Sequence, residues 1–170
     1  MRTNFSINSV PNSLASKLVI RFMIRSDLPE VVAIEQQVFD FPWTEKEFIE
    51  TLRSRNSIGM VVEHSQSRRV LGFCVYALAK NMIEIMTLAV MVEWQRKGVG
   101  ALIVEQLIAK LSPERRTWIL ACVREWNLGA HLFFARQGFK ATGVLRDYYD
   151  DSDEDAYAFM YRLGEQCKGK

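Results

Sequence analysis

The stretch "EIMTLAVMVEWQRKGVGALIVEQL", residues 84–107, decides the fold. Its first half is apolar and rich in residues that favour strands, which predicts a strand over 82–92. Beyond the glycines the apolar residues recur at helical spacing, which predicts a helix over 98–111. Glycines let the backbone approach a ligand closely, and the N–H groups at a helix start favour an anion. The stretch therefore predicts a mixed α/β fold with a candidate phosphate site at Gly98 and Gly100.

The glycine turn "QRKGVGA", residues 95–101, does not match the common nucleotide-binding motifs. No Lys-Ser/Thr pair follows the glycines, so it is not a Walker A loop. Ile103 stands where a dinucleotide fingerprint has its third glycine. Arg96 and Lys97 add positive charge that suits a phosphate-bearing cofactor. Spacing alone leaves two interpretations equally open: a phosphate site, or an ordinary turn at the start of a helix.

Strands and helices alternate along the rest of the chain. Thr44 and Glu47 have the spacing of a capping box, and Ser26 or Asp27 stands where a helix cap is expected. The expected order is β-α-α-β-β-β-α-β-α-β-β. Strands are predicted over 17–25, 57–64, 68–80, 82–92, 117–123, 139–149 and 155–163, and helices over 26–39, 44–55, 98–111 and 128–138.

The bulk composition is that of a globular protein. With 170 residues and 49% hydrophobic residues, we expect one domain over 17–164 between loose tails at 1–16 and 165–170. The net charge of +2 gives no strong signal for nucleic acid. No apolar run reaches the roughly 18 residues of a membrane span, and the N-terminus lacks the apolar core of a signal peptide.

The cysteines and histidines give no sign of a disulfide framework or a metal site. Cys74, Cys122 and Cys167 are far apart and odd in number, which argues against structural disulfides. His64 and His131 do not complete any metal-ligand spacing with them, so no metal is expected. A reduced, cytoplasmic compartment is the default expectation.

The glycine turn and its flanks resemble the Gcn5-related N-acetyltransferases. The acetyl-CoA signature of that family is Gln/Arg-x-x-Gly-x-Gly/Ala, which stands here as Gln95, Gly98 and Gly100. The Asn and Gly-Phe of "N…QGF" follow at the family's distance. The segments at 41–48, "FPWTEKEF", and 145–163, "LRDYYDDSDEDAYAFMYRL", resemble the branch that acetylates protein N-termini, including ribosomal-protein alanine acetyltransferases.

The resemblance covers about residues 18–163 and implies a mixed, mostly antiparallel sheet. The sheet should open between the strands at 82–92 and 117–123, leaving a slot for the thioester. The resemblance also implies that strand backbone binds the pantetheine arm, that the glycine turn cradles the pyrophosphate, and that Asn127 reaches the CoA arm. Asn127 can equally be a simple helix cap. The implied cofactor-binding residues are Leu88, Val90, Val92, Gln95, Arg96, Lys97, Gly98, Val99, Gly100, Ala101 and Asn127.

The chain departs from that branch at two catalytic positions. Where the ribosomal branch has a Glu that acts as base, this sequence has Cys122. Where the branch has a Tyr that protonates the leaving thiolate, it has Phe134. Cys122 is interpreted as a small core residue rather than a nucleophile, and Phe134 as a core aromatic. Glu125 is interpreted as a loop carboxylate. Because Phe134 replaces the Tyr, the group that protonates the leaving thiolate is unidentified.

Glu84 is then the best remaining candidate for the base. It lies in an otherwise apolar strand, where a histone-acetylating branch of the family also has a Glu. Side chains alternate along a strand, so Glu84 shares a face with Met86 and Leu88. A partly desolvated carboxylate there suits a general base. The alternative is a carboxylate at the strand start that simply meets water.

An acidic loop separates the last two strands, and two tyrosines precede it. The loop is either a solvated hairpin tip or a surface that steers a cationic amine. The resemblance favours Tyr148 and Tyr149 as residues that contact the substrate. The loop's carboxylates are Asp147, Asp150, Asp151, Asp153, Glu154 and Asp155.

These features predict acetyl transfer from acetyl-CoA to a protein or peptide amine, by direct attack in a ternary complex. An N-terminal α-amine, with a pKa of ~7.7–8.0 against ~10.4 for lysine, needs the base less. Two alternatives remain open: acetylation of a small amine such as a polyamine or aminoglycoside, and a non-catalytic acyl-CoA-binding module. The protein is expected to be a monomer or weak dimer without a nucleic-acid or membrane partner.

Overall fold

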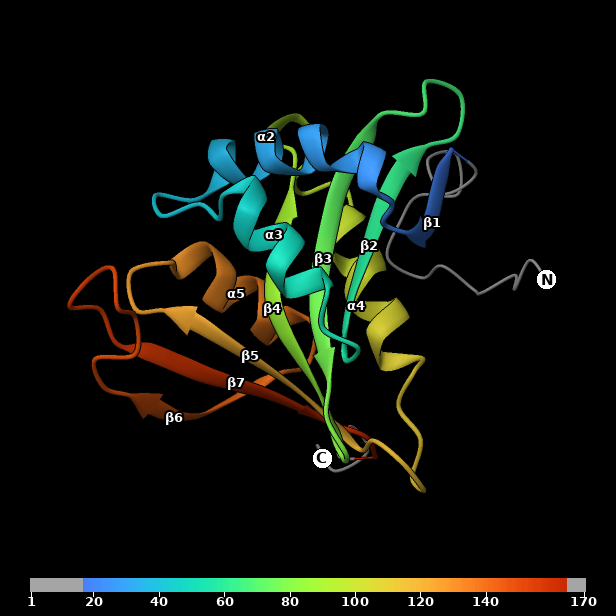
Figure 1. Cartoon of the computed structure of the whole chain (residues 1–170). Coiled ribbons are helices and arrows are strands. Elements are labelled where there is room, and N and C mark those ends of the chain that lie inside the picture. The colour runs from blue at the N-terminus through green and yellow to red at the C-terminus, as the bar shows by residue number, and fades with distance from the viewer. Residues whose placement is uncertain (1–16, 165–170) are drawn as a thin grey trace. The chain divides into compact units, whose positions relative to one another are not determined.

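The computed structural model describes residues 17–164; the predicted tails, and Cys167 within the second of them, lie outside these residues. Figure 1 shows the helices and strands in the predicted order β-α-α-β-β-β-α-β-α-β-β, with two added 3-10 turns. The elements are β1 (Leu18–Phe22), η1 (Arg25–Asp27), α2 (Leu28–Val38), α3 (Glu45–Leu52), β2 (Ser57–His64), β3 (Val70–Leu78), β4 (Met82–Val90), η2 (Val92–Trp94), α4 (Val99–Ile108), β5 (Trp118–Arg124), α5 (Leu128–Arg136), β6 (Lys140–Leu145) and β7 (Ala156–Arg162).

The strands form a mixed, mostly antiparallel sheet, as predicted. Their hydrogen-bonded order is β1-β2-β3-β4-β5-β7-β6. β1 pairs antiparallel with β2, and β7 pairs antiparallel with both β5 and β6. β4 and β5 pair in parallel. β7 is therefore inserted between β5 and β6, which precede it in the chain.

The described residues form two compact units, and β3, β4 and α4 contribute to both. The first unit comprises residues up to Cys74 together with Leu88–Glu105. The second comprises Val75–Thr87 and the residues from Gln106 onward. Each unit is described by itself below.

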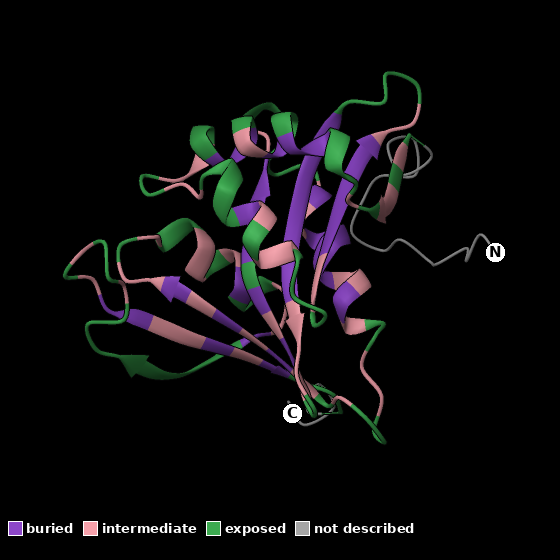
Figure 2. Ribbon diagram, viewed as in Figure 1, coloured by how far each residue is buried: buried purple, intermediate pink, exposed green. Residues whose placement is uncertain are grey.

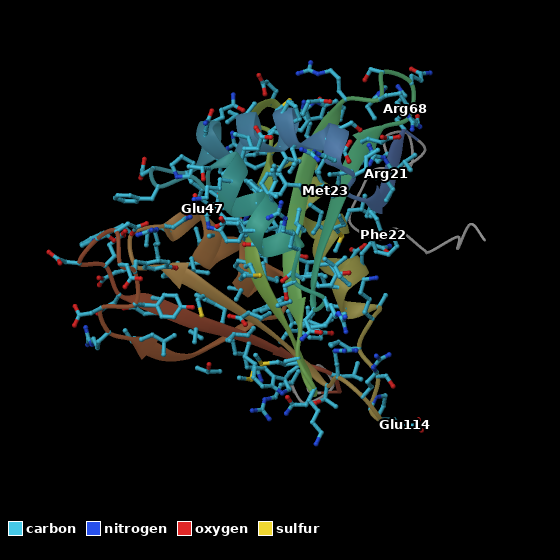
Figure 3. The ribbon with its side chains drawn as sticks, viewed as in Figure 1. Arg21, Phe22, Met23, Glu47, Arg68 and Glu114 are labelled. Carbon is cyan, nitrogen blue, oxygen red and sulfur yellow. The ribbon has the colours of Figure 1, made fainter. Side chains whose placement is uncertain are left out.

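The first unit has its core between the two N-terminal helices and β2 and β3. Phe48 of α3 is fully buried and packs edge-on against Trp43 and Phe73, with ring centroids 5.2 and 5.7 Å apart. The predicted capping box starts α3: the Glu47 N–H donates to Thr44 Oγ1 at 3.3 Å, and the Glu47 carboxylate accepts from the Thr44 N–H at 2.7 Å. Figure 3 labels Glu47 on this helix.

An ion-pair network ties β1 to β2 and to η1. Arg21 donates to Asp27 at 2.7 Å and to Glu63 at 2.7 Å, and Arg68 lies 2.7 Å from the other Glu63 oxygen. Figure 3 shows Arg21 and Arg68 at this end of the unit. Asp27 also accepts from the Ile24 N–H, at 2.8 Å, and makes no side-chain cap of α2. Of the two expected cap residues, Ser26 and Asp27, Asp27 is the one at the N-cap position of α2, but its carboxylate is used by Arg21 and not by a helix amide.

The second unit has its core where α5 covers one face of β7. The rings of His131 and Phe134 pack against Phe159 at 5.2 and 6.2 Å, and Phe134 also packs against Phe139 at 5.1 Å. Phe134 is buried, which confirms it as a core aromatic. Figure 2 shows that β6 is exposed along its whole length. The predicted strand 139–149 is too long, because β6 ends at Leu145. Tyr148 therefore lies in the loop after β6.

Candidate active site

β4 and β5 pair over only part of their lengths. Their register runs from Met82↔Trp118 to Ile85↔Ala121, whereas β5 continues to Arg124 and pairs with β7 throughout. The two strands therefore part after Ile85 and Ala121, which confirms the predicted opening of the sheet.

On the side that faces β4, the backbone of β5 beyond this point is hydrogen-bonded without a strand partner. The Thr117 carbonyl accepts from the Leu163 N–H and the Glu125 N–H donates to the Asp155 carbonyl, at the two ends of β7, so by alternation the even-numbered residues between them turn their carbonyls toward the β4 side. There the Cys122 carbonyl accepts from the Tyr149 hydroxyl at 3.3 Å. The Arg124 carbonyl accepts from the Asn127 N–H at 3.0 Å and lies 2.9 Å from His131 Nε2. Loop and helix residues thus satisfy carbonyls that a neighbouring strand would otherwise bind.

Glu84 lies on the more open face of β4. Ile83 and Ile85 are buried on the opposite face, whereas Glu84 is half-buried and Met86 is 40% exposed. Glu84 is in register with Leu120 of β5 and therefore shares a face with it. The Glu84 side chain is thus neither completely buried nor fully exposed to solvent.

Glu84 and Cys122 share this face, because Glu84 is in register with Leu120 and side chains alternate along β5, and Tyr148 of the loop interacts with Cys122. The Tyr148 hydroxyl and the Cys122 thiol are hydrogen-bonded, and Glu84 acts electrostatically on both. Burial, with added effects of Cys122 and Glu84, raises the pKa of Tyr148 to about 12. Burial also raises the pKa of the Cys122 thiol, which the Tyr148 hydrogen bond opposes. Both groups are therefore protonated at neutral pH, and Cys122 lacks the thiolate that a nucleophile needs.

The interpretation of Cys122 as a core residue is only partly right. Its side chain is half-buried, unlike that of Cys74, which is buried completely. Cys122 is the first residue of β5 beyond the pairing with β4, and Ala158 is its partner on β7. It therefore contributes to the face that Glu84 occupies, not to the packing under α5.

The acidic loop is held by Arg124, a residue that the sequence did not single out. Arg124 bonds to Asp151 and Glu154, and its guanidinium lies 3.8 Å from the centroid of the Tyr149 ring. Burial raises the pKa of Tyr149 to about 12, an effect that the charge of Arg124 opposes. A cation directly after the apolar strand "TWILACV" was the available signal, although the acidic segment begins only at Asp147. The loop is thus not simply a solvated hairpin tip.

The glycine turn belongs to the first unit. Arg96 and Gly98 have positive φ, 57° and 89°, which turn the chain into α4. The Gln95 side-chain amide donates to the Val90 carbonyl at 3.1 Å, and Lys97 Nζ lies 5.2 Å from the Trp94 ring centroid. The earliest hydrogen bond of the helix runs from the Leu102 N–H to the Gly98 carbonyl at 2.9 Å. The amides of residues 99–101 precede it, as at any helix start, and are available to an anion.

The remaining predicted cofactor-binding residues precede or follow this turn in the sequence. β4 carries Leu88 and Val90 in the first unit, but it ends there, so Val92 lies in the turn η2 rather than on the strand. Asn127 caps α5, because its side-chain oxygen accepts from the Ala130 N–H at 3.0 Å. This confirms the cap, and the side-chain NH₂ group is still a donor for a ligand.

Residues 17–164 contain neither a metal-binding cluster nor a helix that could span a membrane. No group of three or more His, Cys, Asp or Glu residues in this range is arranged to hold a metal ion. None of the helices described here has the length and apolarity needed to cross a membrane.

Known proteins resemble the chain in sequence and in fold. The Acetyltransferase (GNAT) family matches residues 28–139. The ribosomal protein bS18-alanine N-acetyltransferase of Escherichia coli K12 is 29% identical over 133 residues, which are 77% of this chain and 88% of that protein. The crystal structure of the E. coli ribosomal-protein-S18-alanine N-acetyltransferase has a TM-score of 0.74 at 25% identity and covers 88% of this chain and 97% of that one. Arabidopsis thaliana NAA60 in complex with acetyl-CoA shares the fold, with a TM-score of 0.73 at 18% identity over 86% of this chain and 99% of that one. Because the family match spans more than half of the residues, the chain belongs to the acetyltransferase (GNAT) family of acyl-transferring enzymes.

Proposed function

We propose that this enzyme transfers the acetyl group of acetyl-CoA to the α-amine at the N-terminus of a protein or peptide. The observation that carries the proposal is that Glu84 and Cys122 share one face where β4 and β5 part, with Tyr148 beside Cys122. A carboxylate there can accept a proton, and a neutral phenol can donate a hydrogen bond. The E. coli relative named for alanine N-acetylation supports an N-terminal acceptor.

The glycine turn fits the diphosphate of the cofactor. Its positive-φ residues turn successive backbone amides into the start of α4, and Arg96 and Lys97 supply positive charge nearby. Bound acetyl-CoA would supply an activated acyl thioester. We assign Gln95, Arg96, Lys97, Gly98, Val99, Gly100 and Ala101 to the pyrophosphate, and Leu88, Val90, Val92 and Asn127 to the pantetheine arm.

Glu84 acts as the base in this proposal, directly or through a water molecule. At pH 7 roughly a tenth of α-amines are already neutral, against about one lysine in a few thousand. A positioned base is typically worth about 10²–10⁴-fold. A half-buried carboxylate such as Glu84 is therefore sufficient for an N-terminal amine, whereas a lysine would depend on it more strongly.

Tyr148 and Tyr149 contact the acceptor in this proposal. Tyr148 is 44% exposed, and its hydroxyl lies beside Cys122 on the same face as Glu84. The carboxylates of Asp147, Asp150 and Asp153 are exposed on the loop and would attract a cationic chain end. A cytoplasmic location and a monomer or weak dimer remain predictions.

The test uses peptides that each offer one kind of amine. One set has a free α-amine and acetylated lysines, the other a blocked α-amine and free lysines, and a third panel contains polyamines and aminoglycosides. Thiol release and product mass are measured for each. We expect acetylation of the first set. Preference for the third panel would instead support a small-amine enzyme, and acetyl-CoA binding without thiol release would support a non-catalytic module.

The role of Glu84 is tested with Glu84→Gln, and Glu125→Gln in the turn after β5 is the matched control. We expect Glu84→Gln to lower kcat/KM for the α-amine peptide by about 10²-fold or more. The control should act like the wild type. Near-normal turnover by Glu84→Gln from pH 6 to 9 would show that the assignment is wrong.

A further inference from the structure

Arg124, the last residue of β5, is bonded to three residues of the loop 146–155. Figure 1 shows this loop between β6 and β7. Its Nη2 donates to both carboxylate oxygens of Asp151, at 2.7 and 2.6 Å. Its Nη1 donates to Glu154 at 2.9 Å and to the Ser152 hydroxyl at 2.8 Å. The Arg124 side chain is 20% exposed, so these charge-assisted bonds are partly shielded from solvent.

The same guanidinium contacts Tyr149 and is connected through it to Tyr148. It lies 3.8 Å from the centroid of the Tyr149 ring, a cation–π contact. The Tyr149 hydroxyl donates to the Cys122 carbonyl, and the Tyr148 ring packs edge-on against Tyr149 with centroids 5.0 Å apart. Arg124, Tyr148, Tyr149 and Cys122 therefore form one connected set, which we call the Arg124 clamp.

The base of the loop is held by different contacts. Asp155 accepts from Arg146 and, at 3.0 Å, from the Asp147 N–H. The pairing of β6 with β7 also ends here, at Leu145↔Ala156. None of these contacts involves the tyrosine rings. Removing Arg124 should thus release the tip of the loop while its base stays in place.

We propose that Arg124 is a positioning residue that places Tyr148 and Tyr149 for the acceptor amine. The proposal rests on the proposed function, because the tyrosines are the residues assigned there to the acceptor. An arginine is required, since a planar guanidinium can bind two carboxylates and lie over a ring at the same time. The ammonium group of a lysine has no such planar fork.

The kinetic test compares Arg124→Gln, Arg124→Lys and the matched control Arg146→Gln. Arg124→Gln should lower kcat/KM for the amine by about 10–100-fold, the size expected when a contact group is displaced by about 1 Å. Arg124→Lys should recover part of the loss. The KM for acetyl-CoA should not change in any variant. Arg146→Gln removes an ion pair from the same loop and should keep wild-type amine kinetics.

A second measurement does not depend on turnover. The pKa of both Tyr148 and Tyr149 is about 12 because the rings are held in the folded loop. If Arg124→Gln releases them, spectrophotometric titration should show the pKa of both falling toward the ordinary value of ~10. If the rings instead stay in place, loss of the Arg124 charge should raise the pKa of Tyr149 further, because that charge lowers it in the wild type. Titration of Tyr148→Phe and Tyr149→Phe assigns the two signals. Arg146→Gln should leave them unchanged.

Two results would overturn the inference. The first is Arg124→Gln with wild-type amine kinetics, whatever its thermal stability. The second is a tyrosine titration in that variant in which neither pKa falls, because the rings would then be held without Arg124. A wild-type protein that acetylates no amine would instead remove the proposed function, and the titration would still decide whether Arg124 places the tyrosines.

Discussion

The hydroxyl of Tyr149 donates a hydrogen bond of 3.3 Å to the carbonyl oxygen of Cys122, on the side of β5 that β4 has left. A loop side chain thereby takes the place of a strand amide. This arrangement lets the sheet open without leaving that carbonyl unpaired. It also connects the acidic loop to β5, the strand that carries Cys122 on the face shared with Glu84.

Tyr149→Phe should test whether the Tyr149 hydroxyl replaces a strand amide as the donor to the Cys122 carbonyl. The variant leaves the half-buried Cys122 carbonyl without its donor, which should lower the free energy of unfolding by about 1 kcal/mol. Urea denaturation measures the change. Tyr148→Phe is the control, because it removes a bond to a thiol and leaves the carbonyl paired. Equal stability of Tyr149→Phe and wild type would show that water satisfies the carbonyl equally well.

Gly98→Ala should weaken acetyl-CoA binding more than it weakens the fold. At a φ of 89°, a Cβ costs about 1 kcal/mol of backbone strain and narrows the anion site. Gly138→Ala is matched to it, since Gly138 has a φ of 84° just after α5 and is not part of the glycine turn. Both variants should lose similar thermal stability, but calorimetry should show weaker acetyl-CoA binding only for Gly98→Ala. Equal affinities in the two variants would argue that the turn is an ordinary helix start.

Cys122 should react slowly with an alkylating agent at neutral pH. Burial raises the pKa of its thiol, so less thiolate is present than in an unperturbed cysteine, and the rate should rise with pH above ~8.5. Mass spectrometry of the alkylated peptides measures it, and buried Cys74 is the internal comparison. Cys122→Ala should still transfer acetyl groups. Rapid alkylation of Cys122 at pH 7, together with an inactive Cys122→Ala variant, would support Cys122 as a catalytic nucleophile and contradict this prediction.

The Arg21–Asp27 pair should make stability depend on pH. Its hydrogen bond with Arg21 lowers the pKa of Asp27 below the ordinary value of ~3.9. A lowered folded-state pKa stabilises the protein above ~3.9, and that contribution is lost as the pH falls through the folded-state pKa. Asp27→Asn should therefore lose about 1.5–3 kcal/mol at pH 7 and little at low pH. Urea denaturation from pH 7 to ~3 tests this, with the exposed Asp40→Asn as the control. A loss that does not depend on pH would show that packing, not charge, is responsible.

Local patterns in the sequence determined the order of the elements, the capping box of α3 and the glycine turn. They could do so because each depends on residues a few positions apart: strand and helix periodicity, the reach of Glu47 to Thr44, and the positive φ that Gly98 readily adopts. The same patterns extended two strands too far, since β4 ends at Val90 and β6 at Leu145, and they did not foresee the side-chain partner of Asp27. Its position at the head of α2 is that of a cap, but Arg21 binds its carboxylate.

Only the tertiary structure decided how the candidate site is assembled. Glu84 is on β4, Cys122 and Arg124 are on β5, and Tyr148 is in the loop after β6. They come together because β7 inserts between β5 and β6 and folds the loop back over the end of β5. No periodicity encodes such a pairing, since its stability comes from contacts between residues distant in the chain. The sequence alone thus supplied the strand, the turn and the candidate carboxylate, and the fold supplied the partners: a phenol beside Cys122 and an arginine that holds the acidic loop.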